Sequence, residues 1–228
     1  MKMPFGQYKG WELDEIPINY LLWLSEETGM WPTLRLGVEA AVTKKLEERD
    51  ALGAKMLTKR DRARLVVAGV EDLSSMWEYY ARWFKNEFYG FELKKPVFKI
   101  ERSRRWMGYW APLEGVLCIN NNYILPQKRF ENILIHEMCH QYVTEQKIID
   151  SSPHGRKWRY IAARMSYSTG NKITICDEEI YAPNSYLSKG KLVILPENTG
   201  VVSTEKVPTS AQEVEDSYEG FIEEFSNM

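Results

Sequence analysis

The sequence predicts an α+β protein, because stretches with helical periodicity occur in the same chain as short apolar runs typical of strands. Residues 72–84 and 129–144 repeat apolar side chains every three or four positions, as a helix with a buried face requires. Residues 96–100 and 115–120 are short, rich in Val, Ile and Leu, and start at Pro or Gly, which indicates strands. Further short strands are expected at 173–175 and 192–194. Helices and strands mixed in this way are typical of the α+β class.

The first part of the chain has the pattern of a small separate module. Residues 5–13 are punctuated by glycines and predict tight turns, and a short apolar helix follows Pro17. Residues 33–48 predict a second helix. The 228 residues suit one domain with an appendage or two small domains. We therefore expect four segments: a small N-terminal recognition module at 1–50, a linker or connecting helix at 51–71, the main domain at 72–196 and a flexible acidic tail at 197–228.

Bulk composition argues against several classes of protein. Hydrophobic residues make up 44% of the chain, but no apolar run approaches the ~20 residues that span a bilayer, so no membrane partner is expected. The first residues lack the apolar stretch of a signal peptide. The three cysteines are scattered and form no C-x-x-C pair, which favours a reducing cytoplasm over a disulfide framework and argues against a zinc ribbon. We therefore expect a cytoplasmic protein.

Charge is unevenly distributed along the chain. The net charge is only −2, yet residues 44–105 contain 16 Lys and Arg residues and no basic residue follows Lys206. Acidic residues instead crowd the segment 213–224. A basic middle with an acidic tail indicates a polyanionic partner, although solvated helix faces and a soluble tail explain the pattern equally well.

All three histidines lie within nineteen consecutive positions, and two of them frame an H-E-x-x-H motif. His136, Glu137 and His140 belong to the predicted helix at 129–144, on which residues four apart share one face. With 3 His and 25 Glu in the chain, chance would give about 0.004 such motifs. Two imidazoles at this spacing can bind one Zn²⁺, and Glu137 is then placed to act on a water that the ion activates. The sequence therefore predicts Zn²⁺ as cofactor.

A third metal ligand is expected at His154. A serine can cap a helix whose first turn contains Pro153, and His154 then lies on the same inward stripe as Trp158 and Ile161 of that helix. A core or capping histidine is the other interpretation of this residue. Carboxylates can also serve as third ligand, and the candidates are Glu145, Asp150, Glu178 and Glu179.

These residues predict hydrolysis of a peptide bond. Glu137 would take a proton from the attacking water and pass it to the leaving amine. The run 115–120 is a candidate edge strand, along which an extended peptide could lie as an added strand. The candidate substrate-binding residues are Val116, Leu117, Cys118 and Ile119.

Several spaced residues carry a resemblance to a known family: Arg105, Gly108, Ile119, the motif H-E-M-C-H, His154, Gly155 and Trp158. This set resembles the SprT-like zinc metalloprotease family, which includes the DNA-dependent protease Spartan, over roughly residues 72–180. The resemblance implies a zincin-like domain whose active-site helix packs on a small mixed sheet. It also implies three histidine metal ligands and a catalytic glutamate within the motif. The chain departs from the family pattern at Gln141, where members often have a small residue, and it lacks the zinc ribbon of many members.

The N-terminal module shows a second resemblance. The stretches MPFGQYKG at 3–10 and YLLWL at 20–24 are similar to a family named for a quorum-sensing-regulated virulence factor. This resemblance implies little chemistry, although such modules occur fused to nucleic-acid enzymes.

The SprT-like resemblance implies proteolysis of proteins, including proteins crosslinked to DNA. DNA contact would then need the N-terminal module or the basic segment 94–105. In the overlapping run 102–110, arginine and aromatic residues are interleaved and could meet phosphates and bases. Inward-packed aromatics with solvated arginines explain that segment as well. The candidate nucleic-acid contacts are Lys94, Lys95, Arg102, Arg104 and Arg105. Two other functions stay open: a nucleic-acid-binding protein with a structural or vestigial zinc, and a non-peptidase zinc hydrolase such as an amidase.

The charge contrast between the basic middle and the segment from Glu213 onward suggests that the acidic tail blocks the active-site cleft. Truncation after Pro208 is then expected to raise the rate of protein cleavage, measured on a denatured protein substrate. An unchanged rate would remove this hypothesis.

Overall fold

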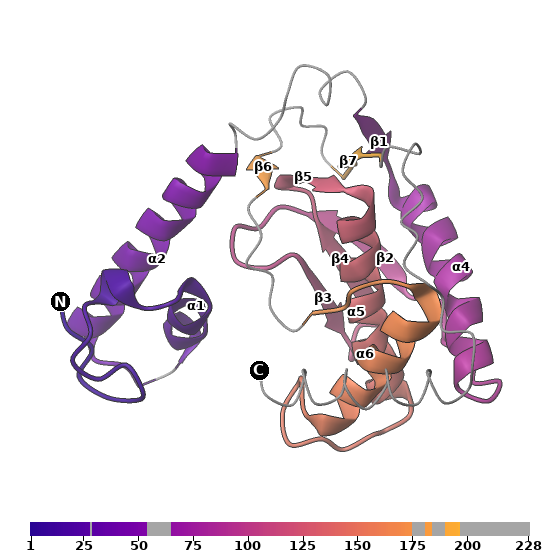
Figure 1. Ribbon diagram of the computed structural model, residues 1–228, viewed down its shortest axis with the longest axis horizontal. Coiled ribbons are helices and arrows are strands. Elements are labelled where there is room, and N and C mark those ends of the chain that lie inside the picture. The colour runs from indigo at the N-terminus through magenta and orange to yellow at the C-terminus, as the bar shows by residue number, and fades with distance from the viewer. Residues whose placement is uncertain (28, 54–64, 175–180, 184–189, 197–228) are drawn as a thin grey trace. The chain divides into compact units, whose positions relative to one another are not determined.

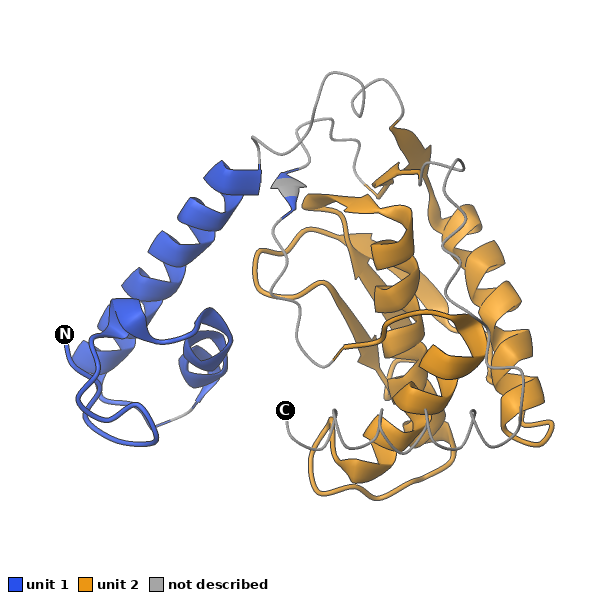
Figure 2. Cartoon of the chain, viewed as in Figure 1, with its two compact units in different colours: residues 1–59, 178–183 blue, residues 60–177, 184–228 orange. Residues whose placement is uncertain are grey.

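The computed structural model describes residues 1–27, 29–53, 65–174, 181–183 and 190–196. The chain forms two compact units, one of residues 1–59 with 178–183 and the other of residues 60–177 with 184–228 (Figure 2). The predicted acidic tail lies outside the described residues, as do the candidate ligands Glu178 and Glu179. Within the described part of the chain, no helix is both long and apolar enough to cross a membrane.

The N-terminal unit is built from a turn region and two helices. A short 3-10 helix, η1 (Leu13–Glu15), leads into α1 (Ile18–Glu26), which is followed by α2 (Pro32–Gly53) (Figure 1). Strand β6 (Ala182–Pro183) is grouped with this unit. Gly6 and Gly10 have φ of 73° and 88°, a conformation that glycine adopts without strain. Apolar residues of all three parts form one core: Met3, Leu13, Ile16, Leu21, Leu24, Leu34, Val38, Ala41, Val42 and Leu46.

The first sheet of the second unit contains β2 (Val97–Glu101), β3 (Gly108–Ala111) and β4 (Val116–Asn120). The order is β2-β4-β3, with β2 parallel and β3 antiparallel to β4. β4 is therefore the central strand, and all five of its residues are buried. The prediction that β4 is an edge strand open to substrate is wrong, because its backbone is paired on both sides.

The second sheet of this unit contains β5 (Tyr123–Pro126) and β7 (Leu192–Leu195), which run parallel, and β1 (Val66–Ala68), which pairs with β7 in antiparallel register. β1 falls inside the segment predicted as a linker at 51–71. Helices and small mixed sheets together confirm the α+β class.

Three helices complete the described part of the second unit: α4 (Val70–Glu87), α5 (Gln127–Glu145) and α6 (Arg156–Thr169). α5 packs against β3 and α6, and α4 packs against α6 (Figure 1). α4 begins two residues earlier than the sequence indicates, because the Asp72 carboxylate accepts the Gly69 N–H at 2.7 Å and so caps the helix. Most residues of α5 are buried, so its polar side chains need internal partners.

Gln141 of α5 is the clearest example of such a polar residue. Its side chain is fully buried, and its oxygen accepts the Trp77 indole N–H of α4 at 3.1 Å. Its nitrogen donates to the Lys94 carbonyl before β2 at 2.6 Å and to the Glu145 carboxylate at 2.8 Å. Gln141 therefore joins α5 to α4 and to the segment before β2.

Replacement of Gln141 by Leu should lower the free energy of unfolding by about 1–3 kcal/mol, because the Trp77 N–H and the Lys94 carbonyl lose a buried partner. Urea denaturation measures this loss. Gln146→Leu, at an exposed position just after the same helix, is the control and should stay within about 0.5 kcal/mol of the unchanged protein. Equal losses in the two variants would contradict the linking role of Gln141.

Candidate metal centre

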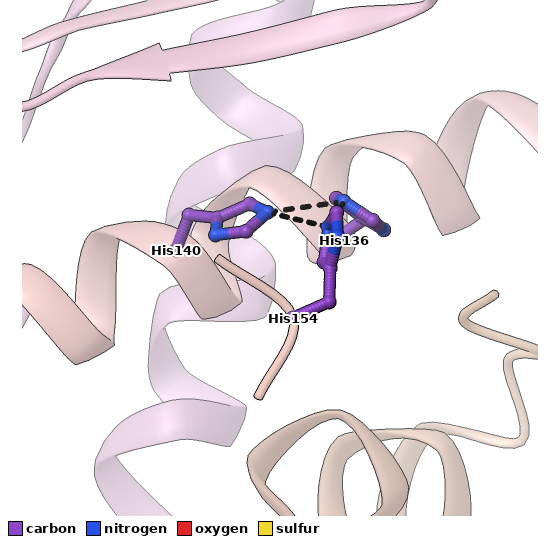
Figure 3. A group of neighbouring side chains, drawn as sticks. All are labelled: His136, His140 and His154. Carbon is purple, nitrogen blue, oxygen red and sulfur yellow. Dashed lines mark hydrogen bonds between the residues drawn. The ribbon is translucent and has the colours of Figure 1, made fainter. Parts of the chain in front are cut away.

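Three imidazoles converge on one point in the second unit. His136 and His140 project from adjacent turns of α5, and His154 projects from the turn before α6 (Figure 3). The Nε2 atoms of His136 and His140 are 3.2 Å apart, and the Nε2 atom of His154 is 3.0 Å from each of them. Within the described residues, these three form the one His, Cys, Asp and Glu cluster able to hold a metal ion.

The donor atoms suit a metal ion. The Nδ1 atom of His136 lies 2.8 Å from the Thr174 carbonyl oxygen and must carry a proton to donate to it, which leaves a lone pair on Nε2. Zinc–nitrogen bonds of about 2.0–2.1 Å in tetrahedral geometry place ligand nitrogens about 3.3 Å apart. The observed separations of 3.0–3.2 Å are close to that value.

The surroundings keep the imidazoles neutral, which is the form that binds a metal. Burial lowers the pKa of His136 well below its ordinary value, and the neighbouring histidines lower it further. Burial and then His154 lower the pKa of His140 to about 3. Burial and then Arg159 lower the pKa of His154.

The indole of Trp158 forms a common wall behind the three histidines. Its ring centroid lies 4.7 Å from that of His136, 5.1 Å from that of His140 and 4.6 Å from that of His154. Trp158 is fully buried, so it restricts the rotation of all three rings.

His154 is placed by a cap that the sequence does not reveal. α6 begins at Arg156 instead of Pro153, so His154 lies in the preceding turn and not in the helix. The Asp150 carboxylate accepts the backbone N–H groups of Lys157 and Trp158 at 2.8 and 3.0 Å and so caps α6 from five residues before the N-cap position. A Cβ at residue 155 would overlap this carboxylate, which explains the glycine that follows His154.

Two of the alternative carboxylate ligands have other roles in the structure. Asp150 is the cap just described, and Glu145 accepts hydrogen bonds from the Gln141 side chain and the Lys94 backbone. Neither belongs to the histidine cluster.

Glu137 lies on α5 between the two histidines of the motif. Its side chain is 6% exposed, and burial raises its pKa to about 8, while a hydrogen bond with the Trp110 backbone opposes this shift. A Cβ at residue 108 would lie 3.0 Å from both Cγ and Oε1 of Glu137. Gly108 therefore allows β3 to pass directly beside this carboxyl group.

The structure separates the predicted nucleic-acid contacts into two groups. Lys94 and Lys95 precede β2, and the three arginines follow it, so a strand about 16 Å long lies between the groups. Lys95 is paired with Glu78 at 2.6 Å. Arg102, Arg104 and Arg105 are exposed on a loop whose backbone is bound by the buried side chain of Asn120.

Sequence reasoning missed several residues that shape this site. The Thr174 contact is made by a backbone carbonyl and has no side-chain signal. Gly108 is identified only through its distance from Glu137. Asp150 caps α6 from five residues before the N-cap position, outside the position at which a sequence pattern signals a cap.

Comparison with known families confirms both resemblances. Residues 73–177 match the model of the SprT-like family, and residues 1–54 match that of the family described as Putative quorum-sensing-regulated virulence factor. No curated protein and no solved structure matches the chain. The second unit thus contains a metalloprotease-like domain.

Asp150→Ala should weaken zinc binding about tenfold to hundredfold, because the turn that carries His154 loses the acceptor of two backbone N–H groups. Competition with a chromogenic chelator measures the affinity. The matched control is Asp72→Ala, which removes the cap of α4 and should lower stability without changing zinc affinity. A similar zinc affinity in both variants would show that the cap of α6 does not position His154.

Proposed function

We propose that this protein, whose residues 73–177 form a SprT-like domain, is a zinc-dependent endopeptidase. The observation that carries the proposal is the convergence of three neutral imidazoles beside a buried glutamate that touches an edge strand. His136, His140 and His154 would hold the ion. A bound zinc ion supplies Lewis acidity toward the scissile carbonyl and lowers the pKa of water toward about 7. Three protein ligands are typical of catalytic zinc sites, because the fourth position stays available.

Glu137 acts as the general base and acid in this proposal. Its carboxylate takes the proton of the attacking water and passes it to the nitrogen of the leaving amine. It directly follows His136 on α5, the helix that carries both motif histidines, and this supports the assignment. The contact with Gly108 and the hydrogen bond with the Trp110 backbone hold it against β3.

The substrate peptide lies along β3 instead of β4. β3 pairs with β4 on one side and ends the described sheet on the other. An extended peptide can add to such an edge through main-chain hydrogen bonds. Because Gly108 of this strand meets Glu137, a peptide added there passes beside the proposed general base.

The proposed substrates are proteins bound or crosslinked to DNA. The SprT-like match supports this class, and the exposed arginines at 102, 104 and 105 supply positive charge on the loop that leads into β3. Lys94 and Lys95 lie at the other end of β2, so they contribute less to this proposal. The buried, unpaired thiols of Cys118 and Cys139 support action in a reducing compartment such as the cytoplasm.

Glu137→Gln should lower the rate of protein cleavage at least about 100-fold, because the substituted amide cannot accept the proton of water. The rate is measured on a denatured protein, and zinc content is measured in parallel and should stay at one ion per chain. Glu131→Gln, on the same helix, is the control and should keep activity within about threefold. Full activity of a zinc-loaded Glu137→Gln protein would exclude Glu137 as the general base.

The same assay distinguishes the other functions. Cleavage of a DNA-binding protein, compared in the presence and absence of DNA, tests the substrate class. A chelator should abolish cleavage in both cases. Arg102→Glu with Arg105→Glu should remove stimulation by DNA and leave cleavage of the denatured protein unchanged. Zinc binding without cleavage of any protein would favour the nucleic-acid-binding function, and hydrolysis of small amides alone would favour an amidase.

A further inference from the structure

A groove of about 730 Å³ lies on the second unit, where the end of α4 meets the last turn of α5 and the start of α6. The proposed peptidase mechanism uses none of its lining residues. Its floor is aromatic and apolar: the rings of Phe88 and Tyr142 are 4.5 Å apart, and Tyr160 and Ile149 also line it. Ile149 is 85% exposed and Tyr160 is 45% exposed, so much of this apolar surface is open to a partner.

The rim of the groove is positively charged. It carries Lys147, Arg156 and Lys157, and none of the described residues that line the groove is acidic. Among the described residues, none of the three cations forms an ion pair, and Lys157 donates to the Ile149 carbonyl. The nearby Arg164 is already compensated by Glu87 at 2.6 Å. A partner for this surface therefore needs both apolar groups and negative charge.

The chain itself contains a segment with this chemistry. In residues 213–225, aromatic and aliphatic residues recur at helical spacing: Tyr218, Phe221, Ile222 and Phe225. The positions between and before them are acidic: Glu213, Glu215, Asp216, Glu219, Glu223 and Glu224. One face of a helix with this sequence would be apolar and the remaining surface negative.

The length of the chain favours this occupant over a separate molecule. Pro196 is the last described residue, and the 22 residues from there to Tyr218 can span up to about 70 Å. Tethering of this kind gives effective concentrations in the millimolar range, so a modest intrinsic affinity suffices.

We propose that residues 213–225 bind in this groove of the same chain, with Phe221 and Phe225 on the aromatic floor and the carboxylates against the cationic rim. The groove wall includes Ile149 and Lys157, which flank the turn that carries His154. The bound segment therefore contacts the same connection that presents the third imidazole.

Binding of a fluorescent peptide of residues 211–228 to the full chain tests the proposal. The unchanged chain should bind the peptide weakly, because its own segment occupies the groove. The variant Phe221→Ala with Phe225→Ala should bind it at least tenfold more tightly. Adding Lys147→Glu and Arg156→Glu to that variant should weaken binding at least tenfold. A peptide with Glu219→Lys and Glu223→Lys should then recover binding to the charge-reversed chain.

Lys99→Glu, an exposed cation on β2, is the control and should change binding less than twofold. Equal effects of Lys99→Glu and the rim variants would overturn the groove as the binding site. If the unchanged and Phe-to-Ala chains bound the fluorescent peptide with equal affinity, the proposal that the chain's own segment occupies the groove would be overturned. If the unchanged chain formed a dimer and the Phe-to-Ala chain did not, the segment of one copy would instead bind in the groove of a second copy. Rim-dependent binding of a single-stranded oligonucleotide, without peptide binding, would make the groove a nucleic-acid site.

Discussion

The burial of polar groups on α5 is the constraint on which the rest of the second unit depends. A helix that is covered on most sides leaves no water for Gln141 or Glu137 and little for the partly buried His136, so each finds a partner within the protein. Gln141 reaches Trp77 and Lys94, Glu137 meets the Trp110 backbone, and His136 meets the Thr174 carbonyl. These contacts fix the rotation of α5 about its axis. They thereby set the direction in which the two motif histidines point.

The third histidine depends on a separate and more local device. The Asp150 carboxylate accepts two N–H groups of the first turn of α6, those of Lys157 and Trp158, and Gly155 leaves the space that this requires. The pair Asp150 and Gly155 thus determines where His154 emerges, and Trp158 on the first turn of α6 supports all three rings. The His-Gly sequence is accordingly a packing requirement of the cap and is separate from the donor chemistry of the imidazole.

The sequence predicted the parts of this site that follow from short-range periodicity. The spacing of His136 and His140 on one helix is a local property, so the pattern located them and Glu137 without knowledge of the tertiary structure. The central position of β4 in its sheet could not be predicted from the sequence pattern, because a buried apolar run looks the same in a central strand and in an edge strand. The start of α6 was misplaced for a related reason: Pro153 is a strong local signal, whereas the cap comes from Asp150 across a turn. Residues of the tail and of 175–180 lie outside the described part of the chain, so their expected roles stay predictions.

The close approach of Gly108 to Glu137 has a consequence for selectivity. The surface beside the proposed general base is main chain, because residue 108 is a glycine whose Cβ would lie only 3.0 Å from Glu137 and 3.1 Å from the Cys118 carbonyl oxygen. A peptide bond placed there would meet a wall that is the same for any substrate sequence. Discrimination between substrates would then fall to flanking side chains, such as that of Trp110, whose indole N–H is held by Thr144 at 2.8 Å. Such an active site would select substrates by the accessibility and extended conformation of the substrate backbone more than by the side chains next to the cleaved bond.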